Sequence, residues 1–429
     1  MIKRDRYLKA LIKKQWNNRI KIITGIRRCG KSTLLFEIFK DYLIQNGVSN
    51  SDIITVSLDD YINEEYRNPY KLAEYLKTQI IDDSHKYYIF IDEIQFAISK
   101  EELNNKDNPV RLYSVLNSLL NMKNVDVYVT GSNSKMLSKD ISTEFRGRGD
   151  VIQGYPLSFS EFYQASKLDK MDAYNEYSMY GGMPYLLQLE DDEDKYQYIS
   201  NLFDEIYFKD IEERYSISLP DVLRELTDDL CSSVGSLTNA SQISRTLQSV
   251  KQTKVNSQTI ANYLTYLTDS FLFSEAKRYD IKGKKYFEYP SKYYCTDIGL
   301  RNIRLGLRQQ EETHIMENII YNELIIRGYV VDVGIIPIVE RNSEGKRVQK
   351  NCEIDFVAKK GPAWFYIQSA LSMDDKVKEE TELRPLNAVN DSFRKVVISK
   401  SYGKRWIDEY GILRINLLDF LLDENCLTS

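Results

Sequence analysis

The residues from Gly25 to Ser32 have the types and spacing of a phosphate-binding loop. They fit the pattern G-x-x-x-x-G-K-[ST], between a β-branched run and a helical pattern. The glycines let the backbone wrap so that N–H groups point at phosphate oxygens, and the following helix adds its N-terminal dipole. The residues expected to contact a nucleotide are Gly25, Ile26, Arg27, Arg28, Cys29, Gly30, Lys31, Ser32 and Thr33.

Two side chains of this loop and an acid pair further along would carry the chemistry. Lys31 is expected to reach the β- and γ-phosphates of ATP, and the Ser32 hydroxyl to ligate Mg²⁺. Asp92 and Glu93 end the apolar run Lys86–Ile91, which is the Walker B arrangement. We expect Asp92 to hold Mg²⁺ through water and Glu93 to polarise the attacking water. ATP and Mg²⁺ are therefore the predicted cofactors.

Further candidates follow the strand pattern at 126–130. Ser132, with Asn133 as second choice, is expected to contact the γ-phosphate or the lytic water, and the alternative is a plain strand–turn. Arg146 and Arg148 lie on a glycine-flanked loop. They are candidates for neutralising γ-phosphate charge, in cis or across the interface of a homo-oligomer. A solvated basic loop is the alternative for both arginines.

These residues need a parallel sheet to bring them together. Strand patterns at 19–24, 52–58, 86–91, 126–130 and 150–155 alternate with helical patterns at 34–43 and 69–81. This alternation predicts an α/β P-loop NTPase core, with helices on both faces of the sheet. A strand inserted between the two Walker strands is expected to carry Ser132.

The middle of the chain predicts helices followed by a hairpin. A helix is expected over 196–215. Helices at 219–234, after 237 and after 255 precede a hairpin formed by 272–279 and 285–289, which describes a winged helix-turn-helix. The hairpin residues that could grip DNA phosphates are Lys277, Arg278, Lys282, Lys284 and Lys285. The third helix carries no Arg or Lys at 257–263 to contact guanine, and a packing or protein-contact module is the alternative.

The C-terminal segment has the layout of a PD-(D/E)xK nuclease without its lysine. Glu317 lies on a helical pattern, Asp355 on a strand and Gln368 on the next strand, but Ala370 stands where that layout has lysine. Gln368 is a poorer metal ligand than a carboxylate. Acids at 379, 380 and 382 could compensate for metal binding, whereas nothing in the sequence compensates for the lysine. We expect a nuclease-like fold used for binding or packing, and Asp355 could instead be a structural acid.

Composition excludes several classes of protein. The chain has 429 residues, 42% of them hydrophobic, and its mean hydropathy is -0.44. No apolar stretch approaches the ~20 residues that a membrane span needs, so we expect a cytoplasmic protein without membrane contact. Five dispersed cysteines and two histidines disfavour a zinc ribbon, a disulfide framework and a His-based triad. The net charge of -5 excludes a uniformly basic nucleic-acid coat.

The chain resembles a bacterial and archaeal family of AAA-like P-loop ATPases. The likeness is carried by 24–33, 91–95, 130–134, 147–148, 156–162 and 180–184, and with the later segments it covers nearly the whole chain. The resemblance implies ATP hydrolysis by a core joined to a helical lid, a winged helix and a restriction-endonuclease-like domain. The predicted domains are 1–165, 166–215, 216–305 and 306–429.

Four functions follow from these patterns. The first is a Mg²⁺-dependent ATPase acting as a nucleotide-driven switch or motor. The second is a regulator whose nucleotide state gates DNA contact, and the third is an ATP-controlled nuclease, which the missing lysine disfavours. The fourth is a nucleotide-binding scaffold with negligible turnover.

Overall fold

A computed structural model describes residues 2–99, 101–102, 110–132, 148–251, 254–308, 311–341, 347–373, 376–401 and 403–428. The chain forms two compact units. Unit 1 comprises residues 1–156, 210–216 and 269–271, and unit 2 comprises 157–209, 217–268 and 272–429. No helix in these described ranges combines the length and apolar character needed to cross a membrane.

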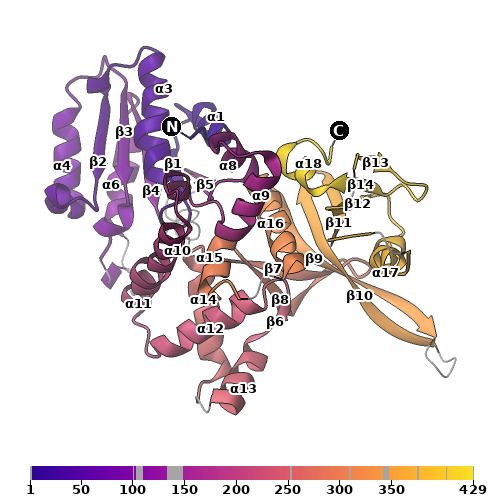
Figure 1. Ribbon diagram of the computed structural model, residues 1–429. Coiled ribbons are helices and arrows are strands. Elements are labelled where there is room, and N and C mark those ends of the chain that lie inside the picture. Colours follow the sequence, from indigo (N-terminus) through magenta and orange to yellow (C-terminus); the bar gives the residue numbers. More distant parts are fainter. Residues whose placement is uncertain are drawn as a thin grey trace. The chain divides into compact units, whose positions relative to one another are not determined.

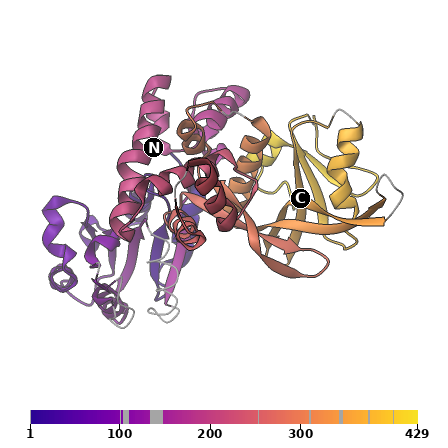
Figure 2. The same ribbon diagram turned by 90° about the horizontal axis from the view of Figure 1, so that it is seen from below.

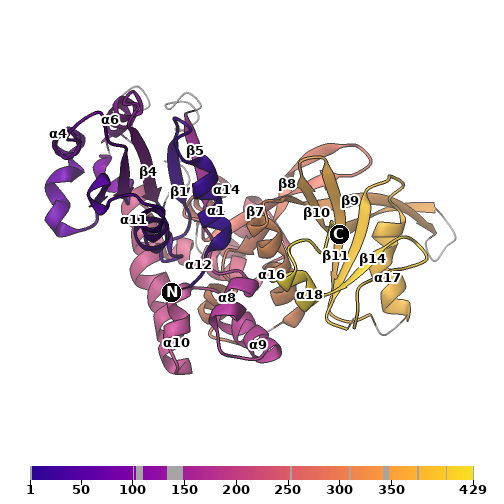
Figure 3. The same ribbon diagram turned by 90° about the horizontal axis from the view of Figure 1, so that it is seen from above.

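Unit 1 is built on a sheet of five parallel strands in the order β2-β3-β4-β1-β5. Figure 3 shows β4, β1 and β5 side by side. The prediction of a strand inserted between the two Walker strands is confirmed, because β4 pairs with both β1 and β3. The carboxyl ends of parallel strands meet at one edge of the sheet. The strands are β1 (Ile20–Thr24), β2 (Ile53–Ser57), β3 (Tyr87–Asp92), β4 (Val125–Gly131) and β5 (Gly149–Gln153).

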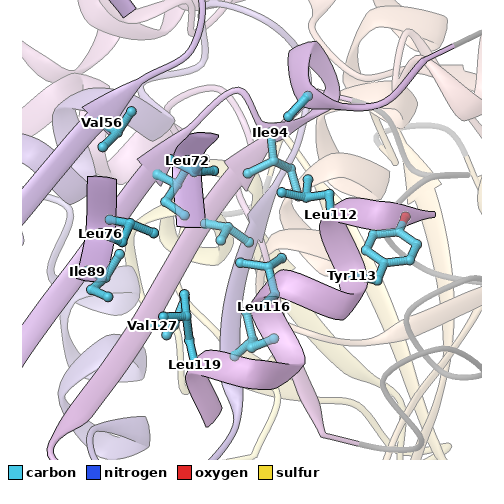
Figure 4. Close-up of a cluster of buried hydrophobic side chains, with 14 of the residues drawn as sticks. Val56, Leu72, Leu76, Ile89, Ile94, Leu112, Tyr113, Leu116, Leu119 and Val127 are labelled. Atoms are coloured by element: carbon cyan, nitrogen blue, oxygen red, sulfur yellow. The ribbon is translucent and has the colours of Figure 1, made fainter. Parts of the chain in front are cut away.

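Both faces of this sheet are covered by helices, as the alternating pattern predicts. In β3, Ile89 and Ile91 face a cluster that includes Leu72 and Leu116 of α4 and α6 (Figure 4). Phe90 faces the other cluster, with the helical residues after the loop. This alternation follows from the two-residue period of a strand. The helical elements of this unit are α1 (Asp5–Lys14), α2 (Lys31–Thr33), η1 (Leu34–Phe39), α3 (Lys40–Gln45), η2 (Asn50–Asp52), η3 (Tyr61–Arg67), α4 (Pro69–Gln79), η4 (Ile94–Ala97) and α6 (Arg111–Leu120).

One ion pair is buried within this sheet. Lys21 of β1 and Asp126 of β4 form a salt bridge with side chains 0% and 3% exposed. Asp126 also accepts hydrogen bonds from the Tyr128 hydroxyl at 2.8 Å and the Trp16 backbone N–H at 3.0 Å. The pair joins the strand before the phosphate loop to the strand that ends just before Ser132.

Unit 2 begins with helices that pack around α15, which contacts α9, α10 and α12 (Figure 1). Asp297 caps α15, and its carboxylate accepts N–H groups from Gly299 at 3.0 Å and Gly182 at 2.7 Å. The helical elements are α8 (Phe159–Ala165), α9 (Lys170–Tyr180), η5 (Pro184–Gln188), α10 (Asp192–Asn201), η6 (Leu202–Phe208), α12 (Pro220–Ser232), α13 (Ala240–Lys251), α14 (Ser257–Asp269), α15 (Ile298–Arg304), α16 (Glu312–Ile326), α17 (Lys376–Asn387) and α18 (Leu417–Leu422). Most of α11 (Lys209–Tyr215) belongs to unit 1.

The strands of unit 2 form one mixed sheet in the order β13-β14-β12-β11-β10-β9-β7-β8-β6. The predicted hairpin is confirmed as β7 paired antiparallel with β8 (Figure 2). The hairpin also joins the C-terminal strands, because β7 pairs in parallel with β9. The strands are β6 (Leu237–Thr238), β7 (Phe273–Asp280), β8 (Lys285–Cys295), β9 (Val330–Arg341), β10 (Arg347–Lys360), β11 (Ala363–Ala370), β12 (Arg394–Ser399), β13 (Trp406–Ile407) and β14 (Leu413–Asn416).

Candidate functional site

The phosphate loop follows β1 and packs tightly against the end of β5. The Gly154 N–H donates to the Thr24 carbonyl at 2.7 Å. Gly25 has φ +141°, and a Cβ added there would lie 2.1 Å from the Gly154 carbonyl oxygen. Gly30, with φ +93°, precedes the helical segment that begins at Lys31. A side chain therefore fits neither the backbone conformation at Gly25 nor the space beside it.

Lys31 lies inside this loop with its side chain 3% exposed. Its ammonium donates to the carbonyls of Gly25 at 3.2 Å and Ile26 at 3.1 Å. It also lies 3.9 Å from the Glu93 carboxylate. The loop thus encloses a buried ammonium group between backbone carbonyls and the acid pair.

Asp92 is a buried carboxylate that accepts a short hydrogen bond from the Thr130 hydroxyl of β4. Burial raises the pKa of Asp92 above its ordinary value, while hydrogen bonding to Thr130 and to the nearby Ser32 hydroxyl opposes the rise. Thr130 also accepts the Glu93 backbone N–H at 3.0 Å. One threonine therefore orients both members of the acid pair, and sequence reasoning had assigned it no role of its own.

Glu93 stands in a left-handed backbone conformation, with φ +51°. Gln95 donates a short hydrogen bond to its carboxylate, and the Ser132 hydroxyl lies 3.4 Å from the same oxygen. Gln95 also lies 3.3 Å from the Ser132 hydroxyl. The predicted pair Glu93 and Ser132 is thus brought together, and Gln95 is an additional polar group of the site. Asn133 lies outside the described residues.

A second acid with two arginines lies beside the loop. The Arg27 guanidinium donates to Ser132 at 3.3 Å and pairs with Asp210 at 2.8 Å. Arg214 pairs with the other Asp210 oxygen at 2.7 Å. Burial raises the pKa of Asp210, and both arginines oppose that rise. Sequence reasoning missed Asp210 and Arg214, because nothing local in α11 indicates a neighbour some 180 residues away.

Of the two predicted loop arginines, Arg148 does not join this group. Arg148 is exposed, and its carbonyl accepts the N–H of Ile20, the first residue of β1. This places Arg148 at the amino-terminal edge of the sheet, whereas the phosphate loop leaves the opposite edge. A contact from Arg148 to a phosphate in the same chain is therefore not supported, and a contact across an oligomer interface stays a prediction. Arg146 lies outside the described residues.

The acids of the predicted nuclease-like site surround a cavity of about 340 Å³ in unit 2. Glu317, Asp355 and Gln368 all line it, as does Ala370. Asp355 accepts the Ser369 backbone N–H at 2.8 Å. Burial, and next the nearby Glu317 charge, raise the pKa of Asp355 well above its ordinary value. The three predicted residues are thus brought together.

The structure also supplies a lysine that the sequence pattern could not reveal. Lys292 of β8 has a side chain 4% exposed, and its ammonium lies 3.0 Å from Glu317 and 2.7 Å from Glu353. Burial alone would lower the pKa of Lys292, but the carboxylates of Glu317, Asp355 and Glu353 raise it above its ordinary value. The expectation that nothing compensates for the missing lysine is therefore wrong in one respect: Lys292 places a positive charge beside the acids of the cavity.

The basic residues of the hairpin are largely at the surface. Lys277, Lys282, Lys284 and Lys285 are exposed. The Lys282 ammonium donates to the Pro337 carbonyl at 2.9 Å. Arg278 is only half-exposed, and its guanidinium lies 5.1 Å from the centre of the Phe287 ring.

Comparison with known proteins supports an AAA-like core in unit 1. Residues 17–163 match the AAA domain family, and residues 171–311 match a domain family of unknown function. The parallel sheet, the phosphate loop and this match define an AAA-like P-loop ATPase domain.

Two curated relatives match most of the chain. A Haemophilus influenzae protein described as uncharacterized is 33% identical over 428 residues, which is 98% of this chain and 99% of that protein. The chain belongs to the same protein family. An uncharacterized protein of Methanocaldococcus jannaschii is 29% identical, covering 76% of this chain and 71% of that protein. A solved Walker-type ATPase of Pyrococcus abyssi is 15% identical with a TM-score of 0.47, covering 71% of this chain and 96% of that chain.

Proposed function

We propose that this protein binds ATP with Mg²⁺, hydrolyses it, and uses the nucleotide state to drive a switch or motor movement. The observation that carries the proposal is the meeting of Lys31, Asp92 and Glu93 at one edge of the sheet. The Lys31 ammonium lies 3.9 Å from Glu93, and both acids share the Thr130 hydroxyl. Paired acids beside a phosphate loop are the parts that phosphoryl transfer to water requires.

The residues fit a magnesium–triphosphate complex. Ser32 and, through water, Asp92 would hold Mg²⁺, which when bound neutralises charge on the β- and γ-phosphates. The Lys31 ammonium, which donates to loop carbonyls, would donate to those phosphates. The loop backbone fits because Gly25, with φ +141°, takes a conformation that lets the loop wrap and approach Gly154 closely, which a Cβ would prevent.

Glu93 is the residue proposed to act on the attacking water. Its carboxylate would accept a proton from that water, since carboxylates at such positions serve as bases. Gln95 and Ser132 contact the same carboxylate and would hold its orientation. Positioning of this kind accounts for much of the rate in phosphoryl transfer.

Steady-state phosphate release tests this assignment. Glu93→Gln should lower the rate by a hundredfold or more while leaving ATP affinity nearly unchanged, because base catalysis typically contributes ~10²–10⁴-fold. Glu74→Gln, at an exposed position of α4, is the matched control. Equal rates in wild type and Glu93→Gln would remove Glu93 from the mechanism. Tight ATP binding with negligible release in wild type would favour the scaffold function.

A nucleotide-gated DNA contact is a second candidate. Helices α12, α13 and α14 with the β7–β8 hairpin support a winged helix, and four of the five basic hairpin residues are exposed. Neutralising Lys282, Lys284 and Lys285 should weaken binding to duplex DNA and lower its salt slope by roughly one per lysine. Neutralising Lys71 and Lys77, which are exposed on α4, is the control. The absence of binding at low salt would end this candidate.

A further inference from the structure

The phosphate loop carries an arginine of its own beside the residue proposed to act on water. The Arg27 guanidinium donates to the Ser132 hydroxyl at 3.3 Å, and that hydroxyl lies 3.4 Å from the Glu93 carboxylate. The Lys31 ammonium lies 3.9 Å from the same carboxylate group. Two cations of one loop thus approach Glu93, whereas Arg148 lies at the opposite edge of the sheet.

This loop arginine is already paired with an acid of α11. One Arg27 Nη group lies 2.8 Å from Asp210, whose side chain is 14% exposed. Burial is the largest cause of the raised pKa of Asp210, and the Glu93 charge adds to it, so the two acids lie within electrostatic reach of each other. Carboxylates and phosphates are the oxyanions that the planar guanidinium fork binds best. A phosphate bound beside Glu93 would therefore compete with Asp210 for Arg27.

The ion pairs of α11 allow Arg27 to leave without stranding a buried charge. Arg214, one turn along the helix, pairs with the other Asp210 oxygen at 2.7 Å, and its side chain is 10% exposed. The Arg214 Nη1 group is buried and has no hydrogen-bond partner among the described residues. Because a guanidinium can bind both oxygens of one carboxylate, Arg214 can take over the oxygen that Arg27 leaves. A buried donor would then gain a partner.

We propose that Arg27 neutralises the γ-phosphate of ATP within the same chain, and that Asp210 holds Arg27 until the triphosphate displaces it. This inference rests on the proposed binding of MgATP at the phosphate loop, and it adds how the site distinguishes ATP from ADP. ADP has no γ-phosphate and leaves the Arg27–Asp210 pair in place, whereas ATP transfers the arginine from α11 to the nucleotide. Because the chain on both sides of residues 210–216 belongs to unit 2, the exchange alters the segment that connects the nucleotide site to unit 2.

Calorimetric titration with two magnesium–nucleotide complexes tests the proposal. The nucleotides are ADP and adenylyl imidodiphosphate, an ATP analogue that resists hydrolysis. Arg27→Gln should lower the affinity for the analogue at least ~10-fold and that for ADP less than about twofold, because only the analogue offers a γ-phosphate to the arginine. Asp210→Asn should raise the affinity for the analogue by about 3–10-fold, because the competing carboxylate is gone. The double variant should bind the analogue as weakly as Arg27→Gln does.

Two control variants match these changes. Arg19→Gln removes an arginine that pairs with Asp150 at 3.1 Å, at the amino-terminal end of β1. Glu213→Gln neutralises an exposed acid of α11. Both should bind the two nucleotides as wild type does. A purely structural ion pair would weaken the binding of both nucleotides in Arg27→Gln and in Asp210→Asn, so the opposite shifts expected here separate the two roles.

Two results would overturn the proposal while leaving ATP binding by the loop intact. One is an equal change for ADP and the analogue in Arg27→Gln. The other is an unchanged or lowered affinity for the analogue in Asp210→Asn. Absence of analogue and ATP binding in wild type would end this proposal together with the proposed function. Arg27→Gln should fold, because Arg214 still pairs with Asp210, and the thermal midpoint of each variant checks this. Asp210→Asn is a second measurement that does not depend on the Arg27 variant.

Discussion

Replacing Gly25 by alanine tests how the phosphate loop is held. A Cβ at this position would lie 2.1 Å from the Gly154 carbonyl oxygen, well inside the 3.0 Å that real Cβ atoms keep. The strained backbone should lower the free energy of unfolding of unit 1 by about 1–3 kcal/mol. The shift of neighbouring atoms needed to avoid the clash should lower it by a further ~1–3 kcal/mol. Gly47→Ala is the control, because Gly47 has φ +89° but nothing within 4 Å of the added Cβ. The difference between the two variants isolates the contact with Gly154.

Urea unfolding followed by the fluorescence of Trp16 measures this difference. In a background with Trp364→Phe and Trp406→Phe, Trp16 is the single remaining tryptophan of the chain and reports on unit 1. Gly25→Ala should lose ~1–3 kcal/mol more than Gly47→Ala, and its affinity for MgATP should fall at least ~10-fold because the loop must shift. Equal losses in both variants, or unchanged ATP affinity in Gly25→Ala, would refute this account of the loop.

Two further predictions concern buried charges. Lys21→Met leaves the buried Asp126 without its ammonium partner, so unit 1 should lose about 3–5 kcal/mol by the Trp16 assay, and a loss below about 1 kcal/mol would contradict this. Burial raises the pKa of Asp297 to about 6, against 3.8 ordinarily. Between these two pKa values the folded state binds more protons than the unfolded state, so the free energy of unfolding of unit 2 should fall by about 3 kcal/mol in all as pH rises from below 3.8 to above 6. Asp297→Asn should flatten that dependence in urea unfolding at each pH, and an unchanged slope in the variant would be inconsistent with it.

Much of unit 1 could be predicted from the sequence for a local physical reason. A strand, a glycine loop and a helix that follow one another directly determine the conformation of the loop between them. The Gly25–Ser32 segment can therefore be recognised from the local sequence alone. Apolar runs that end in polar residues identify parallel strands, whose carboxyl ends share one edge of the sheet. The approach of Asp92 and Glu93 to Lys31 follows from these two facts.

The remaining site residues depend on contacts that no local pattern encodes. Asp210 reaches Arg27 because α11 returns to unit 1 after the chain has entered unit 2. Lys292 reaches Glu317 because β7 pairs with β9 and so brings β8 into the C-terminal sheet. For Arg148 the local sequence predicts a phosphate contact that the fold does not provide within the chain. The register of β5 with β1 places Arg148 at the amino-terminal edge of the sheet, opposite the phosphate loop.

The central claim is that a magnesium–triphosphate complex binds at the loop formed by Gly25–Ser32. Calorimetric titration of the purified chain with MgATP tests it most directly, with Lys31→Ala as the variant and Lys9→Ala, an exposed position of α1, as the control. We predict saturable binding to wild type and to Lys9→Ala, and a loss of about 100-fold or more in Lys31→Ala, because a buried charge-assisted contact to phosphate contributes several kcal/mol. Absence of binding to wild type, or equal binding to all three proteins, would contradict the claim.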